Sequence, residues 1–112
     1  MGFQLTEVVG RDAPAHSERC SIAYFSLAAD HSTTTSFNKV AEEYFVIAQG
    51  TGTVRVGARE VTVAPGSLVV VPSRAEHSLH AASSNTLYFY AISAPAFSPD
   101  DYVAVSNPVN AR

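Results

Sequence analysis

The chain has 112 residues, of which 46% are hydrophobic and 15% charged, and its net charge at pH 7 is −3. This length supports one domain with a buried core and leaves no room for a second. The acidic balance and the lack of a basic stripe argue against a nucleic-acid partner, because phosphate backbones bind clustered lysine and arginine. No run of 18 apolar residues occurs, so the sequence predicts no membrane span and no membrane partner.

The cysteine content and the first residues bear on the compartment. Cys20 is the single cysteine, so no internal disulfide can form, which suits a reducing environment. The first seven residues lack the basic start and apolar core of a signal peptide. We therefore expect a cytoplasmic protein.

Short runs of β-branched and aromatic residues recur along the chain, separated by glycine, proline and polar clusters. They predict strands over 21–27, 43–48, 53–56, 60–63, 67–71, 77–81 and 86–92. No stretch of helical period lies between them. Seven short strands at roughly ten-residue spacing indicate an all-β sandwich or barrel.

The tail is expected to behave differently from the rest of the single domain, 1–112. We predict a barrel core over about 20–94, followed by a proline-containing strap over 95–112. The strap would lie on the barrel or on a neighbouring subunit and end in a frayed terminus. Residues 100–103 would form at most one helical turn.

Side-chain alternation along strands assigns faces to the candidate polar residues. Glu43 begins a strand and shares a face with Phe45 and Ile47, so a carboxylate would sit at the barrel mouth above an apolar floor. His77 begins a later strand in the same manner. His80 has the opposite parity and should point elsewhere.

The spacing of certain residues resembles that of the cupin family. Six residues separate Glu43 from Gly50, five separate Gly66 from Pro72, and four more precede His77. These spacings resemble the second half of the first cupin motif and most of the second. Fifteen residues between the two glycines fit compact bacterial cupins, and the ending is also similar to that of small single-domain members.

The resemblance implies an all-β fold of the double-stranded β-helix type, the cupin or jelly-roll barrel. It also implies a homodimer, because small cupins resemble one another in forming dimers whose sheets or tails pack across the interface. The exposed edges of an isolated barrel of this size are consistent with that expectation.

The chain departs from the family where metal-binding cupins carry a His-x-His pair. Counting back from Glu43 places Ser36 and Asn38 at those positions, and neither of the two registers supplies a histidine. Asp30 replaces the leading glycine of the first motif, and Arg74 stands where the second usually has glycine. Asp tolerates the turn geometry that favours glycine.

These residues define a candidate site. Glu43 and His77 are the candidate catalytic residues, because a partly buried carboxylate and imidazole can be held in different protonation states near neutral pH. A hydrogen-bonded structural pair without chemistry is the alternative. The candidate ligand-binding residues are polar side chains expected to line the pocket: Ser36, Asn38, Tyr24, Tyr88 and Tyr90. For the tyrosines, barrel packing or a dimer interface is the alternative.

We expect no cofactor and no metal, because one imidazole and one carboxylate are too few strong ligands for a transition metal. A divalent ion, if one binds, would use Glu43, His77 and Asn38, with His16 or His31 completing the site from a loop. Three functions remain open for a small-molecule ligand. They are a metal-independent isomerase, cyclase or lyase, a non-catalytic binding protein, and a metal-dependent dioxygenase or isomerase with an atypical ligand set.

Overall fold

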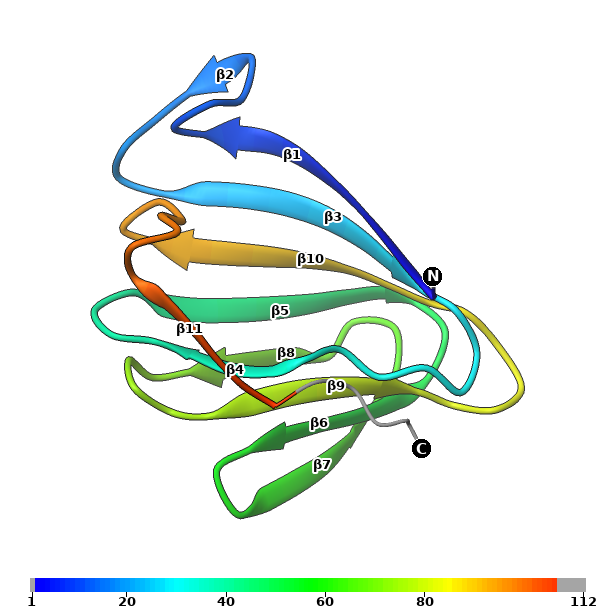
Figure 1. Cartoon of the computed structure of the whole chain (residues 1–112). Coiled ribbons are helices and arrows are strands. Elements are labelled where there is room, and N and C mark those ends of the chain that lie inside the picture. Colours follow the sequence, from blue (N-terminus) through cyan, green and yellow to red (C-terminus); the bar gives the residue numbers. More distant parts are fainter. Residues whose placement is uncertain (1, 107–112) are drawn as a thin grey trace.

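The computed structural model describes residues 2–106, which form two facing β-sheets (Figure 1). Sheet A has the order β2-β1-β3-β10-β5-β8 and sheet B the order β11-β4-β9-β6-β7. The strands of sheet A are β1 (Phe3–Gly10), β2 (Ala15–His16), β3 (Ser21–Leu27), β5 (Glu42–Gln49), β8 (Leu68–Val71) and β10 (Leu87–Ala94). Those of sheet B are β4 (Thr35–Asn38), β6 (Gly52–Val56), β7 (Arg59–Val63), β9 (His77–Ala81) and β11 (Tyr102–Ser106). Across this described part no helix is long and apolar enough to cross a membrane.

All seven strands predicted from the sequence are present, and β3 and β9 have the predicted bounds. Four further strands were not predicted. Strand β4 lacks the run of β-branched and aromatic residues that predicts a strand, but Ser36 and Asn38 point inward and are buried. Strands β1 and β11 extend the two sheets beyond the span expected for the barrel core.

The prediction of a helical turn at 100–103 is wrong beyond its first residues, because β11 begins at Tyr102. Pairing with β4 imposes the extended form, with Tyr102 opposite Asn38 and Val103 opposite Phe37. The strap therefore lies on the barrel as an edge strand of sheet B (Figure 1, orange-red). The expected frayed end, 107–112, is outside the described residues.

The core lies between the inner faces of the two sheets. Phe89 is at its centre, stacked on Phe25 at 5.0 Å and edge-on to Phe45 at 5.7 Å between ring centroids. Leu79 and Val54 close the core from sheet B. Each such side chain contributes about 1.5–3 kcal/mol by leaving water, so this layer fixes the spacing of the sheets and of any group between them.

Two residues other than glycine adopt positive φ: Asp30 at 64° and Arg74 at 68°. At these two positions the chain replaces a glycine of the cupin motifs that it resembles. The reason for that preference is visible in the backbone, since a left-handed conformation is strained for side chains with a Cβ. The chain keeps both turns without the glycines.

Candidate active site

Glu43 and His77 meet between the two sheets. Glu43 begins the inward-facing positions of β5 in sheet A, and His77 is the first residue of β9 in sheet B. His77 Nε2 lies 2.9 Å from Glu43 Oε1, and the side chains are 6% and 18% exposed, respectively. The predicted parity therefore holds, and a single ion pair joins the sheets at one end of the core.

The hydrogen bonds of His77 define its proton positions. Nδ1 lies 2.9 Å from the carbonyl oxygen of Ala75. A carbonyl only accepts, so Nδ1 carries a proton and Nε2 is left to face the carboxylate. The proton between Nε2 and Oε1 can reside on either partner, giving imidazolium with carboxylate or neutral imidazole with carboxylic acid. The pair is thus arranged to hold one transferable proton.

The pKa of His77 is raised above its ordinary 6.5. Burial is the largest influence and by itself lowers this pKa, because it penalises the charged ring. The hydrogen bond to Glu43, the backbone hydrogen bond to Ala75 and the charge of Glu43 act in the opposite direction and together outweigh burial. The protonated ring consequently persists above the pH at which a free histidine loses its charge.

Strand β4 supplies two further residues of the predicted pocket. Ser36 is the register partner of His77, and Asn38 donates from Nδ2 to Glu43 Oε1 at 3.4 Å. Both are buried, 5% and 6% exposed. Asp101 fixes the turn after β4, where its carboxylate accepts the backbone N–H groups of Val40 and Ala41 at 2.8 and 3.1 Å. The strap therefore keeps Asn38 in contact with the carboxylate of Glu43.

One oxygen of the pair remains open to a ligand. Both contacts of Glu43 fall on Oε1, and within residues 2–106 Oε2 has no hydrogen-bond partner. Arg11 Nε is the one fully buried side-chain nitrogen or oxygen without a partner in that range. The Glu43 side chain is 18% exposed, so solvent reaches the pair from the carboxylate side. The site can present one free carboxylate oxygen beside the buried imidazole.

The ring of Phe45 forms the apolar floor predicted beneath this pair. Its centroid is 5.6 Å from that of His77. Phe45 is 3% exposed and belongs to the continuous core. This contact excludes water from one side of the imidazole and accounts for its burial.

The three tyrosines predicted to line the same pocket lie on the opposite face of sheet A. Tyr90 is the register partner of Tyr24, and their ring centroids are 4.9 Å apart. Tyr88 stacks on Tyr24 at 6.2 Å. Their neighbours in sequence, such as Phe89, face the core. No pocket at Glu43 can include these rings, because the sheet itself lies between them.

The residues present do not fit the transition-metal site of the wider family. Among residues 2–106, no three His, Cys, Asp or Glu side chains are close enough to hold one ion. His16 and His31 are exposed and bond to nearby backbone oxygens, of Arg11 and Ala29. One imidazole and one carboxylate, already bonded to each other, leave too few strong donors.

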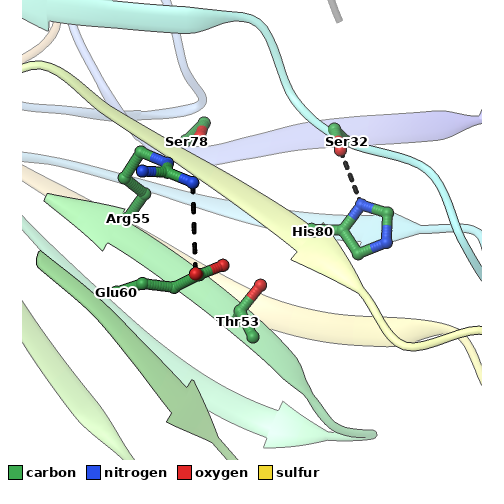
Figure 2. Close-up of a pocket in the computed structure, with 6 residues that line it drawn as sticks. All are labelled: Ser32, Thr53, Arg55, Glu60, Ser78 and His80. Atoms are coloured by element: carbon green, nitrogen blue, oxygen red, sulfur yellow. Dashed lines mark hydrogen bonds and ion pairs between the residues drawn. The ribbon is translucent and has the colours of Figure 1, made fainter. Parts of the chain in front are cut away.

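A second polar cluster was not predicted. On the outer face of sheet B, His80 Nδ1 lies 2.6 Å from Ser32 Oγ, and His80 Nε2 lies 3.2 Å from Asp30 Oδ1. Ser32 and His80 line a cavity of about 290 Å³, shown in Figure 2. Strand alternation predicts that His80 points away from the inner face, and its side chain does so. No feature of the sequence indicated that Asp30 and Ser32, at least 48 residues away along the chain, would contact it.

Two facing β-sheets with a buried carboxylate–imidazole pair at one end define an all-β barrel of the jelly-roll kind. The family model described as Cupin domain matches residues 23–93, well over half of the chain. The chain belongs to the cupin domain family. No curated protein matches it.

Solved structures share this fold at low sequence identity. Streptomyces Pac13, described as a nucleoside dehydratase and also solved with uridine, superposes with a TM-score of 0.77 at 18% identity, covering 95% of this chain and 80% of that one. The DMSP lyase DddQ from Ruegeria pomeroyi DSS-3 gives 0.80 at 17%, covering 92% and 51%. KdgF from Halomonas sp. gives 0.72 at 19%, covering 88% and 83%. The cupin fold is thus shared with enzymes.

Proposed function

We propose that Glu43 and His77 form the proton-transfer pair of a metal-independent active site that acts on a small polar molecule. The observation that carries this proposal is the 2.9 Å contact between two largely buried groups that share one proton. Such poised groups suit general acid–base catalysis. The reaction class would be a lyase, isomerase or cyclase reaction, in which a proton is removed from one atom and delivered to another.

Glu43 and His77 would have different roles in this reaction. The open Oε2 of Glu43 would accept a proton from the ligand, while His77, anchored on Ala75, would hold the opposite charge. Ser36 and Asn38 would orient the ligand by hydrogen bonds. The names of two neighbours in fold support an elimination, since a dehydratase and a lyase both remove a proton and a leaving group. This support is by analogy of fold.

Solvent exchange of a ligand proton tests the proposal before the full reaction is known. Small polar molecules, with uridine among them, would first be screened by thermal shift. Each molecule that stabilises the protein would then be followed by proton NMR in D₂O with EDTA present. We expect loss of one ligand C–H signal with the wild type and not with Glu43→Gln or His77→Gln. The matched control is Glu42→Gln, which removes the exposed carboxylate of the residue that precedes Glu43 in β5.

The outcomes separate the three functions that the sequence left open. Exchange that survives EDTA and requires Glu43 supports the acid–base site. Stabilisation without exchange in any variant would instead identify a non-catalytic binding protein. Exchange abolished by EDTA and restored by a divalent ion would overturn the metal-independent reading.

We also propose that the partner of this chain is a second copy, bound through the outer face of sheet A. Two adjacent rows of side chains cross four strands there. One row is Tyr24, Tyr90, Val46 and Leu68, and the other is Ile22, Ile92, Tyr44 and Val70. Neither row contains a charged residue, although an antiparallel sheet normally places polar residues on its solvated face.

The size and symmetry of this face favour a second copy as its occupant. Four strands about 4.8 Å apart, crossed by two rows, present an uncharged area on the order of 250 Å², enough for the apolar centre of a standard interface that buries roughly 800 Å² on each partner. Leu68 and Val70 are 61% and 52% exposed in the single chain. In a two-fold dimer the same face of each copy forms the interface. The two uncharged rows of one copy would therefore pack against those of the other.

Light scattering after size exclusion tests the dimer. We expect the wild type at twice the mass of the chain, and Tyr90→Lys or Val70→Lys at the mass of one chain. Thr62→Lys, an exposed residue of β7 in sheet B, is the control and should remain dimeric. A wild type that is monomeric at every concentration would contradict the proposal.

A further inference from the structure

The outer face of sheet B carries a serine, a histidine and an aspartate in one hydrogen-bonded chain. Ser32 Oγ is 2.6 Å from His80 Nδ1, and His80 Nε2 is 3.2 Å from Asp30 Oδ1. A carboxylate only accepts, so Nε2 carries the proton of the neutral ring and Nδ1 accepts the hydroxyl proton of Ser32. This order of nucleophile, base and orienting carboxylate is the arrangement that activates a serine.

Backbone hydrogen bonds hold this chain of residues on β9. The N–H of Asp30 bonds the carbonyl of Ala81 at 3.1 Å, and the N–H of Ala81 bonds the carbonyl of His31 at 3.0 Å. Ser32 is itself the bridge partner of His80. The segment that carries Ser32 and Asp30 is therefore an extension of the sheet, and a rigid scaffold positions the three groups.

A cavity of about 290 Å³ lies beside the serine. Figure 2 shows the Ser32 hydroxyl and the His80 ring directed at each other, with Arg55, Glu60 and Thr53 on the neighbouring strands. Arg55 and Glu60 form an ion pair at 4.0 Å, both about half exposed. The charged groups that face the cavity are thus Arg55 of β6 and Glu60 of β7, with Asp30 at its edge. A polar cavity of this size suits a small polar acyl ester.

We propose that Ser32 is a nucleophile for acyl transfer from small activated esters, with His80 as its base and Asp30 as a positioning residue. Ser32 Oγ attacks the ester carbonyl while its proton passes to His80 Nδ1. The carbon–oxygen bond to the alcohol breaks, and the alcohol leaves with the proton from His80. Water then attacks the acyl-serine, with His80 accepting one of its protons, and the acid leaves as Ser32 regains its own. This site is separate from Glu43 and His77, which face the interior.

p-Nitrophenyl acetate is the probe, because it reports alcohol release by colour and leaves an acetyl group that mass spectrometry locates. Any exposed imidazole accelerates its hydrolysis, so the decisive readout is acetyl on Ser32 in a rapidly quenched sample. We expect a burst of p-nitrophenolate with acetyl on Ser32 in the wild type. Ser32→Ala should abolish both, and His80→Gln should reduce the burst rate at least about tenfold. Ser83→Ala and His16→Gln are matched exposed controls and should leave both unchanged.

Asp30→Asn tests the positioning role. Asn tolerates the positive φ at this position, so the turn is kept while the charge is lost. We expect the rate of Ser32 acetylation at saturating ester to fall about tenfold. The ester concentration that gives half of the maximal rate should stay unchanged, because Asp30 contacts His80 and not the ester. Absence of acetyl from Ser32, or equal acetylation of Ser32 in wild type and His80→Gln, would overturn the proposal. A maximal rate of Ser32 acetylation in Asp30→Asn equal to that of the wild type would remove Asp30 from it.

Discussion

Two histidines on one strand are each joined to a carboxylate, and they differ in almost everything else. His77 and His80 lie three residues apart on β9 and point to opposite sides of sheet B. His77 and Glu43 are 6% and 18% exposed, whereas His80 and Asp30 are 43% and 73% exposed. The inner imidazole has its Nδ1 bonded to a backbone carbonyl, and the outer one has its Nδ1 bonded to a serine.

The difference shows how burial sets the energetic role of the same pair of groups. Inside the core, the imidazole of His77 cannot be solvated if Glu43 is lost, so the pair is coupled to the stability of the fold. On the surface, water replaces a lost partner at little cost in free energy. The outer pair therefore contributes little to the stability of the fold. Five measurements can break or sharpen this comparison.

The largest expected effect is on stability when the inner carboxylate is removed. Glu43→Ala leaves a buried imidazole without its acceptor and should lower the free energy of unfolding by about 3 kcal/mol. Urea unfolding, followed by circular dichroism, measures this loss. Glu60→Ala, which removes an exposed carboxylate of β7, should cost less than about 1 kcal/mol. Equal losses in the two variants would refute the contrast between buried and exposed pairs.

The next effect is the pH dependence of the inner pair. Because the pKa of His77 is raised in the fold, its contribution to stability is complete below 6.5 and is lost as the pH rises through the raised value. We expect the stability difference between wild type and His77→Gln to shrink across this window. Urea midpoints measured from pH 6 to pH 9 would reveal it, and a difference that grows with pH would have the wrong sign.

NMR titration of the His77 ring tests the cause of that dependence. The wild-type midpoint should lie above 6.5. In Glu43→Gln it should fall below 6.5, since burial, the largest influence, is then opposed mainly by the bond to Ala75. A midpoint that does not move would show that Glu43 does not control the proton.

A smaller, stabilising effect is expected near the inner site. Arg74 holds a φ of 68°, and its N–H donates to the carbonyl of Asn38 at 2.7 Å. Arg74→Gly should relieve the left-handed strain and raise the free energy of unfolding by about 0.5–1 kcal/mol. Ser73→Gly, at an ordinary φ, is the control and should lower it slightly. A destabilised Arg74→Gly would mean that the side chain contributes more than its backbone costs.

The smallest effect belongs to the outer pair. Asp30→Asn removes a largely exposed charge and keeps a residue suited to positive φ, so the free energy of unfolding should change by less than about 0.5 kcal/mol. Thermal melting beside the wild type is sufficient to measure this. A loss comparable to that of Glu43→Ala would show that the outer carboxylate supports the fold.

Much of the inner site could be predicted from the sequence because local rules determine it. Alternation along a strand placed Glu43 and His77 on inward faces, and counting from Glu43 assigned Ser36 and Asn38 to the same pocket. In the structure Glu43 contacts both His77 and Asn38, and Ser36 is the register partner of His77. The tyrosines were assigned to this pocket because parity shows that Tyr88 and Tyr90 share a face but does not show which face is inside.

The sequence by itself determined the class of fold, the seven central strands and the identity of the buried pair, because strand alternation and turn residues act over a few positions. Only the tertiary structure decided that short polar residues at 35–38 form a buried strand, and that the strap pairs with it. Only the tertiary structure brought Asp30 and Ser32 to His80. These outcomes depend on pairing between distant segments, which no local pattern of side chains specifies.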